Sequence, residues 1–159
     1  MIKGLRVDHR LLHGQVAVAW FNAIGANTIL IANDDVAVDE SRKNIMRLAK
    51  PANAKLVMKD IDYCVKAINE GLTDKYSMLV VVESIADAYR LIIETGKFPS
   101  LNLGGTKSGE GKKAISKTVN ITKEEKELLD DLIEKGIEVE IRQVPGDSKI
   151  IYKKEMGEE

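Results

Sequence analysis

The sequence predicts an α/β protein, an open three-layer α/β/α domain whose mostly parallel sheet has about six to seven strands. Three observations predict it. Short apolar, β-branched runs alternate with segments of helical period along the 159 residues. Glycines, prolines and capping residues separate these segments at short intervals. No repeat or linker divides the chain, so we expect one domain over residues 1–159, with helices on both faces of the sheet.

The first half of the chain supplies four expected strands and three expected helices. The strands are residues 2–7, 28–32, 55–58 and 78–82. The last of these is a five-residue apolar run, which is typical of a fully buried central strand. The first helix covers residues 15–23, and Gly25 ends it. A second helix begins at Asp39 and ends at Pro51, whose ring cannot continue a helix. The third carries a one-sided apolar stripe at residues 61, 65, 68 and 72.

In the second half, Ser84 is expected to cap a helix that Gly96 ends, and Leu101 and Leu103 lie in the next strand. A polar, basic, glycine-rich loop follows at 107–113, and then a sixth strand at 115–119.

The pattern Thr122-Lys123-Glu124-Glu125 is a capping box, so we expect it to start the last helix, which Gly136 ends. Residues 137–141 alternate between apolar and charged side chains, which indicates a strand with one solvent-exposed face near the edge of the sheet. Residues 149–153 are expected to add a short hairpin arm.

Composition excludes several classes of protein. The net charge is −1, from 24 basic and 25 acidic residues, which does not fit a general nucleic-acid or membrane-binding surface. No apolar run approaches the ~20 residues that a membrane span needs, and Met1 leads into a strand without a signal-peptide core. The lone Cys64 is expected as a small buried thiol, which fits a cytoplasmic location.

The most informative segment is Arg6-Val7-Asp8-His9-Arg10-Leu11-Leu12-His13-Gly14-Gln15, which contains both histidines of the chain. It joins the first strand to the first helix. His13 immediately precedes that helix, where unpaired backbone N–H groups and the helix dipole favour a phosphoryl group. A neutral imidazole is a competent nucleophile toward phosphorus, although a histidine that only caps or packs at a turn would fit equally well. Gly14 allows a phosphate to approach closely.

The neighbouring residues have two interpretations each. Asp8 can accept a hydrogen bond from an imidazole, or it can bond its own backbone as a turn residue. Arg10 can bind phosphate oxygens with its planar fork, or it can be a solvated turn residue. Arg6 can reach the same loop or pair with a carboxylate elsewhere. We expect His9 to be an exposed neighbour, because only His13 abuts the helix.

Other motifs carry weaker signals. Trp20 and Phe21 are expected in the core rather than against a ligand. The pair Asp34-Asp35 resembles part of a carboxylate metal-binding site but has no further ligands at fixed spacing, so we expect no metal. The run 104–113 is rich in glycine and lysine, but it fails the spacing of a P-loop and leads into a strand rather than a helix. We therefore expect no nucleotide cofactor.

The segment from Arg6 to Val16 resembles the active-site signature of the IIB subunits of the bacterial sugar phosphotransferase system, mannose/fructose/sorbose family. The Asn33-Asp34 turn, the strand before Glu83-Ser84, Asn102-Leu103-Gly104-Gly105 and the ending 137–145 also fit the layout of that family. The resemblance implies an open, mostly parallel α/β fold. It also implies that His13 is the phosphorylated residue and that the family's loop arginine and aspartate are Arg10 and Asp8. We add Arg6, Gly14 and Gln15 as phosphate-binding residues.

The resemblance implies a function as well. Such a protein takes a phosphoryl group from a phosphohistidine of a separate IIA partner and passes it to a sugar held by membrane IIC and IID subunits. It would work at the inner face of the membrane without inserting into it. The Asp-His-Arg-Leu-Leu-His form leans toward an amino sugar such as N-acetylgalactosamine. Two alternatives remain: a non-catalytic module that binds a phosphorylated small molecule, and a regulatory phosphoacceptor, which lacks the expected acidic cluster after the first strand.

Overall fold

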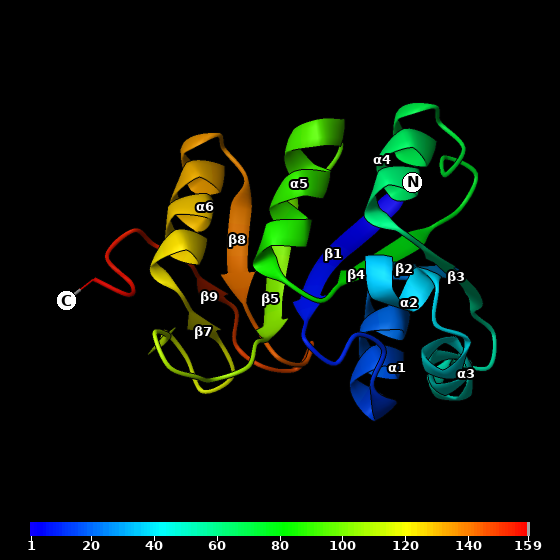
Figure 1. Ribbon diagram of the computed structural model, residues 1–159, viewed down its shortest axis with the longest axis horizontal. Helices are drawn as coiled ribbons and strands as arrows, with labels where there is room; N and C mark the ends of the chain where they lie inside the picture. The colour runs from blue at the N-terminus through cyan, green and yellow to red at the C-terminus, as the bar shows by residue number, and fades with distance from the viewer. Residues whose placement is uncertain (159) are drawn as a thin grey trace.

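The structure, a computed structural model that describes residues 1–158, is a seven-stranded sheet with helices on both of its faces (Figure 1). The strands lie in the order β3-β2-β4-β1-β5-β8-β9. Their bounds are β1 Ile2–Asp8, β2 Thr28–Ala32, β3 Lys55–Lys59, β4 Met78–Val82, β5 Ser100–Gly105, β8 Glu138–Ile141 and β9 Ile150–Ile151. Every neighbouring pair is parallel except β8 and β9, which form the expected hairpin arm. The predicted fold class is confirmed.

Within residues 1–158 six helices connect these strands, and three of them begin at the capping residues that the sequence predicts. Their bounds are α1 Gly14–Ala23, α2 Asp34–Ala37, α3 Glu40–Ala49, α4 Ile61–Asn69, α5 Ile85–Thr95 and α6 Lys123–Glu134. Asp39 and Ser84 accept hydrogen bonds from the first turns of α3 and α5. Thr122 and Glu125 form the complete capping box at the start of α6.

The alternating side chains of the strands feed two separate hydrophobic clusters, one on each face of the sheet. In β4, Met78, Val80 and Val82 pack toward α4, α5 and α6, whereas Leu79 and Val81 pack toward α1, α2 and α3. These two clusters make the three layers. Cys64 lies fully buried in the first cluster, and Trp20 and Phe21 lie buried in the second, as the sequence predicts.

The position of β1 decides where a functional site can form. This strand pairs with β4 on one side and β5 on the other, so it lies near the middle of the sheet. The chain leaves β1 for α1 on one face, whereas it leaves β4 for α5 on the other. The loop after β1 therefore lies at the carboxyl edge where successive connections diverge, which is the usual ligand position in open parallel sheets.

The structure corrects two details of the predicted elements. Residues 34–37 form a short helix, α2, instead of a loop, because the Asn33 side chain accepts from the Val36 N–H. The expected strand at 115–119 is absent. Instead β6 (Lys113–Ala114) and β7 (Asn120–Ile121) pair as a short antiparallel hairpin. Its turn is closed by the Ser116 hydroxyl, which accepts from the Thr118 and Val119 N–H groups.

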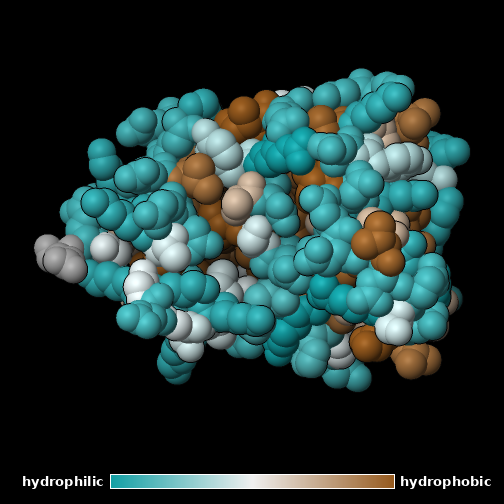
Figure 2. Space-filling view, in the orientation of Figure 1, coloured by the Kyte–Doolittle hydropathy of each residue, from teal (hydrophilic) through white to brown (hydrophobic). Residues whose placement is uncertain are grey.

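The visible surface is mostly hydrophilic, and hydrophobic residues show as scattered patches, some between the helices and some protruding at the right-hand side of the view (Figure 2). None of the helices within residues 1–158 combines the length and the apolar composition that crossing a membrane requires.

Candidate active site

The loop between β1 and α1 is held in shape by its two leucines. Leu11 and Leu12 are buried in the hydrophobic cluster beneath α1. The Leu11 N–H donates to the Asp8 carbonyl at 2.8 Å and closes a tight turn. Leu11 has φ +58°, and it is the one non-glycine residue among 1–158 in the left-handed region. Burial of the two leucine side chains offsets that backbone strain. The flanking residues Arg10 and His13 are therefore held on a fixed backbone.

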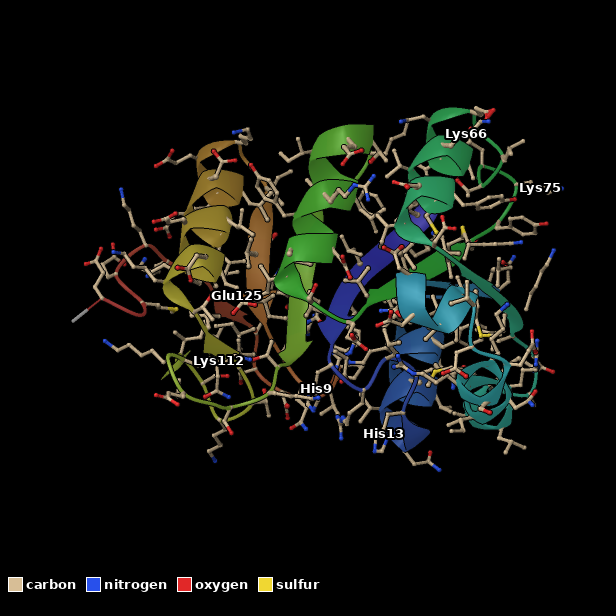
Figure 3. The ribbon with its side chains drawn as sticks, in the orientation of Figure 1. His9, His13, Lys66, Lys75, Lys112 and Glu125 are labelled. Carbon is tan, nitrogen blue, oxygen red and sulfur yellow. The ribbon has the colours of Figure 1, made fainter. Side chains whose placement is uncertain are left out.

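His13 is the N-cap residue of α1 and is exposed at the carboxyl edge of the sheet (Figure 3). Its backbone is extended, and its side chain makes no capping hydrogen bond. Gly14 follows with φ +48°, a conformation that favours glycine, and Gln15 is exposed in the first turn. Among the helices of residues 1–158, α1 alone lacks a side-chain cap. Its first N–H groups are therefore left open toward an anion.

Asp8 holds the loop through both of its carboxylate oxygens. Oδ1 accepts from the Arg10 N–H at 3.0 Å and from Arg10 Nε at 3.3 Å, and Oδ2 accepts from Arg6 Nη2 at 3.3 Å. The side chain is 2% exposed. The turn interpretation of Asp8 is therefore observed, and its oxygens face the two arginines rather than an imidazole.

Arg10 is the exposed cation of the loop. Its guanidinium is anchored at Nε by Asp8, and the side chain remains 35% exposed. Anchoring at Nε fixes the plane of the fork and leaves the two terminal nitrogens available to a ligand, an arrangement suited to the oxygens of a phosphoryl group.

Arg6 lies in a different position from the one that phosphate binding requires. Its side chain is 5% exposed. Nη1 donates to Asn102 Oδ1 at 2.6 Å and to the Arg142 carbonyl at 3.2 Å, and the guanidinium lies 5.3 Å from the centre of the Trp20 ring. Burial lowers the pKa of Arg6, while the Asp8 carboxylate opposes that shift. The structure therefore corrects the sequence-based assignment: Arg6 lies beneath the loop and not at its surface.

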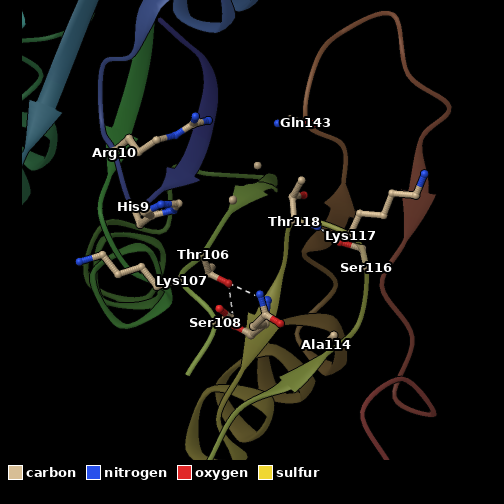
Figure 4. A pocket seen from close by; sticks show the side chains of 13 residues that line it. His9, Arg10, Thr106, Lys107, Ser108, Ala114, Ser116, Lys117, Thr118 and Gln143 are labelled. Atoms are coloured by element: carbon tan, nitrogen blue, oxygen red, sulfur yellow. Dashed lines mark hydrogen bonds between the residues drawn. The ribbon is translucent and has the colours of Figure 1, made fainter. Parts of the chain in front are cut away.

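His9 also differs from its prediction as an exposed neighbour. It is half-buried, and its backbone N–H donates to the Gly105 carbonyl at 3.0 Å. Its ring lines an open cleft between the β1 loop, the end of β5 and the β6–β7 hairpin (Figure 4). Nδ1 is buried and has no partner among the described residues. The other lining residues are mostly polar or cationic, and they include Arg10, Thr106, Lys107, Ser108, Lys117 and Gln143.

The hairpin wall of this cleft is tied to β5 by Thr106. Its hydroxyl donates to the Asn120 carbonyl at 2.7 Å and accepts from the Asn120 N–H at 2.6 Å (Figure 4). The Thr106 N–H donates to the Thr118 carbonyl at 2.9 Å. These bonds place hydroxyl groups and lysines opposite Arg10. The sequence indicated a basic loop here but not its position beside the histidines.

Three residues lie beneath the site, namely Asn102, Gly104 and Arg142. The sequence placed Asn102 and Gly104 in a run that fits the family's layout, but it did not place any of the three against Arg6. Asn102 is opposite Arg6 in the register between β1 and β5, and Gly104 leaves the space that the Arg6 guanidinium fills. The signal that could have found them is the polar Asn102 and the pair Gly104-Gly105 within an otherwise apolar strand, since glycine in a strand often marks a close approach.

The acidic pair Asp34-Asp35 is not part of a cluster of metal ligands within residues 1–158. Asp34 Oδ1 accepts from the Ile61 N–H at 2.9 Å, which ties α2 to the start of α4. Within residues 1–158, no three His, Cys, Asp or Glu side chains gather in a way that could hold a metal ion.

An open, mostly parallel α/β sheet with an exposed histidine before an uncapped helix, and an exposed arginine on the same loop, is an arrangement suited to phosphoryl transfer. The chain belongs to the family described as "PTS system sorbose subfamily IIB component", which it matches over residues 2–159. The suspected resemblance is therefore confirmed. Family membership makes the chain a phosphotransferase component of a sugar phosphotransferase system (PTS).

Individual relatives agree with this assignment. The chain is 28% identical to the fructose-specific EIIB component of Bacillus subtilis over 143 residues, which cover 90% of this chain and 88% of the relative. It is 29% identical to the mannose-specific EIIAB component of Escherichia coli over 151 residues, 94% of this chain but 47% of that longer protein. The crystal structure of the N-acetylgalactosamine-specific IIB component 1 from Escherichia coli superposes with a TM-score of 0.90 at 27% identity, over 96% of this chain and all of the other.

Proposed function

We propose that His13 accepts a phosphoryl group from a phosphohistidine of a IIA subunit and passes it to a sugar, a hexose or an amino sugar, held by membrane IIC and IID subunits. The chain would do this at the inner, cytoplasmic face of the membrane. The observation that carries the proposal is the exposed His13 at the open start of α1, on the same loop as Arg10, whose terminal nitrogens have no hydrogen-bond partner among residues 1–158. The mannose-specific EIIAB component of Escherichia coli, whose name joins IIA and IIB, supports the choice of a IIA subunit as the donor.

The proposed transfer has two steps. In the first, a nitrogen of the His13 imidazole attacks phosphorus while the P–N bond to the donor histidine breaks, and the proton that the His13 ring loses is taken up by the released donor imidazole. In the second, a sugar hydroxyl attacks the same phosphorus, the P–N bond to His13 breaks, and the hydroxyl proton ends on the released imidazole. Negative charge spreads over the equatorial oxygens in both steps. Arg10 and the N–H groups at Gly14 and Gln15 are positioned to stabilise that charge.

The open cleft beside the loop supports a carrier more than a binder. A carrier must meet two different macromolecules at one atom, whereas a binding module for a small phosphorylated molecule would enclose its ligand. His13 is exposed and lies outside the set of residues that line the cleft. We infer that the cleft, with Lys107 and Lys117 on its walls, receives part of the partner rather than the phosphoryl group itself.

The test is covalent phosphate. The protein is incubated with a histidine-phosphorylated IIA domain, and the adduct is located by mass spectrometry. We expect an acid-labile, base-stable phosphate on His13 that is lost in His13→Ala and kept in the matched variant His9→Ala. Phosphate on His9, or transfer that survives in His13→Ala, would contradict the assignment.

A second measurement separates the carrier from both alternatives. Phosphorylated protein is mixed with unphosphorylated IIA in the presence of EDTA, and the return of label to IIA is followed. We expect label to return without nucleotide or divalent ion, because His13, Arg10 and the helix start supply the charge stabilisation. Strong binding of a small phosphorylated molecule without any covalent phosphate would favour the binding module.

Arg10 is expected to act on the transition state. Arg10→Ala should slow transfer by at least about a hundredfold while the protein stays folded. Arg10→Lys should restore only part of the rate, because an ammonium group lacks the bidentate fork.

A further inference from the structure

Two arginines, Arg6 and Arg10, form ion pairs with the single carboxylate of Asp8 at the active-site loop. Asp8 is nearly fully buried, and so is Arg6, whereas Arg10 is one-third exposed. Each arginine holds a different oxygen: Arg6 Nη2 lies 3.3 Å from Oδ2, and Arg10 Nε lies 3.3 Å from Oδ1. Arg6 therefore occupies the half of the carboxylate that Arg10 would otherwise be able to take.

The Arg6 guanidinium is held through both of its terminal nitrogens. Nη1 donates to Asn102 Oδ1 and to the Arg142 carbonyl. A Cβ atom on Gly104 would lie 2.1 Å from Arg6 Cζ, so the glycine provides the space in which the group sits. Arg6 Cζ lies 5.3 Å from the centre of the Trp20 ring. Arg142 Cζ lies 5.0 Å from the centre of the same ring.

We propose that Arg6 is a positioning residue for phosphoryl transfer that acts on Arg10 through Asp8. By holding Oδ2, Arg6 restricts Arg10 to a single anchor at Nε and keeps its two terminal nitrogens directed at the phosphoryl group. The proposal rests on the function proposed above, because it assigns Arg6 a role through Arg10.

The physical reason is competition for one carboxylate. Arginine prefers bidentate, fork-to-fork pairing with a carboxylate. If Arg6 is removed, Oδ2 becomes free inside a poorly solvated site, and the uncompensated charge draws Arg10 into a bidentate pair with Asp8. A terminal nitrogen is then engaged by Asp8 together with Nε, and the phosphoryl oxygens lose the bidentate fork. Arg6 thus acts as a spacer that keeps Arg10 available.

The experiment is a double-mutant cycle on transfer from phosphorylated IIA, with Arg6→Met, Arg10→Ala and the double variant. We expect Arg6→Met to lower kcat by about tenfold to a hundredfold, the size of effect that a misplacement of about 1 Å produces. KM should change by less than about twofold, since the face that receives IIA is intact. In the Arg10→Ala background, the same Arg6→Met change should lower kcat by less than about twofold.

Two controls separate positioning from folding. Leu129→Ala in α6 removes a fully buried side chain far from the loop, and it should lower stability but leave kcat unchanged. If Arg6→Met does not fold, Asn102→Ala takes its place in the same cycle, because it removes a partner of Arg6 and leaves both charges.

The outcomes are distinct. Loss of kcat that depends on Arg10 supports the proposal. Equal loss in the presence and absence of Arg10, or a wild-type kcat in Arg6→Met while Arg10→Ala is slow, would overturn the positioning role alone. A wild-type kcat in Arg10→Ala would overturn the proposed role of Arg10 itself, and the role of Arg6 with it.

Discussion

Alanine at Gly104 should destabilise the protein far more than alanine at the adjacent Gly105. A Cβ on Gly104 would lie 2.1 to 2.3 Å from three atoms of the Arg6 guanidinium. A Cβ on Gly105 would have its nearest neighbour at 3.7 Å, His9 Nδ1, which is an ordinary contact. Neither glycine has a positive φ, so backbone strain does not separate the two variants.

The magnitude follows from what Arg6 loses. Overpacking a filled site costs ~1–3 kcal/mol. The end of an arginine side chain can usually move away, but here it is buried against Asn102 and Asp8, and breaking a buried ion pair costs ~3–5 kcal/mol. We expect Gly104→Ala to lower the free energy of unfolding by about 3 kcal/mol, between these two ranges. Gly105→Ala should change it by less than about 0.5 kcal/mol.

Urea unfolding followed by the fluorescence of Trp20, the sole tryptophan, measures both variants. With a slope of about 2–3 kcal/mol per molar urea, Gly104→Ala should lower the midpoint by about 1–1.5 M. In an Arg6→Met background most of this penalty should disappear, because the crowded group is gone. Equal midpoints for Gly104→Ala and Gly105→Ala would refute the reasoning.

Three further predictions concern other parts of the molecule. Burial, aided by Asp60, raises the pKa of Cys64 to about 12, against about 8.5 when unfolded. The folded thiol therefore keeps its proton as pH rises above about 9, and wild type should lose stability relative to Cys64→Ala by up to ~1.4 kcal/mol per pH unit, measured by urea unfolding from pH 8 to 10.5. Thr122→Ala removes the cap of α6 and should lower stability by ~1 kcal/mol in thermal melts, whereas Thr122→Ser should retain it. His13→Ala should leave the free energy of unfolding, measured by urea unfolding, within ~0.5 kcal/mol of wild type, because the exposed side chain makes no capping bond; a larger loss would indicate a structural role.

The fold was predictable from the sequence because its signals are local. Strands β2 and β4 have the predicted bounds, since apolar, β-branched runs mark a buried parallel strand. The starts of α3, α5 and α6 follow from Asp39, Ser84 and Thr122, whose side chains accept from the first turn. The strand expected at 115–119 failed because Ser116 bonds to the backbone and makes a turn, and this local competition outweighed the apolar ends of the run.

The candidate site was only partly predictable. His13 and Arg10 could be placed on one loop, because their spacing and the start of the helix are local features. The neighbours of Arg6 are separated from it by 96 residues at Asn102 and 136 at Arg142. The register of β1 on β5 brings them together, and a single sequence does not contain that pairing. The burial of Arg6 and the half-burial of His9 follow from this register.

The central position of β1 also sets an order of events during synthesis. The ribosome makes this strand before both of its neighbours, β4 and β5, which begin at Met78 and Ser100. At about 5–20 residues per second, about 5 to 20 seconds pass between synthesis of Arg6 and of Asn102. Until β4 has been made, β1 has no neighbouring strand to pair with, and until β5 has been made, Arg6 has no Asn102 to hold it. The active-site loop, although it directly follows β1, therefore becomes fully ordered only after β5 has been made.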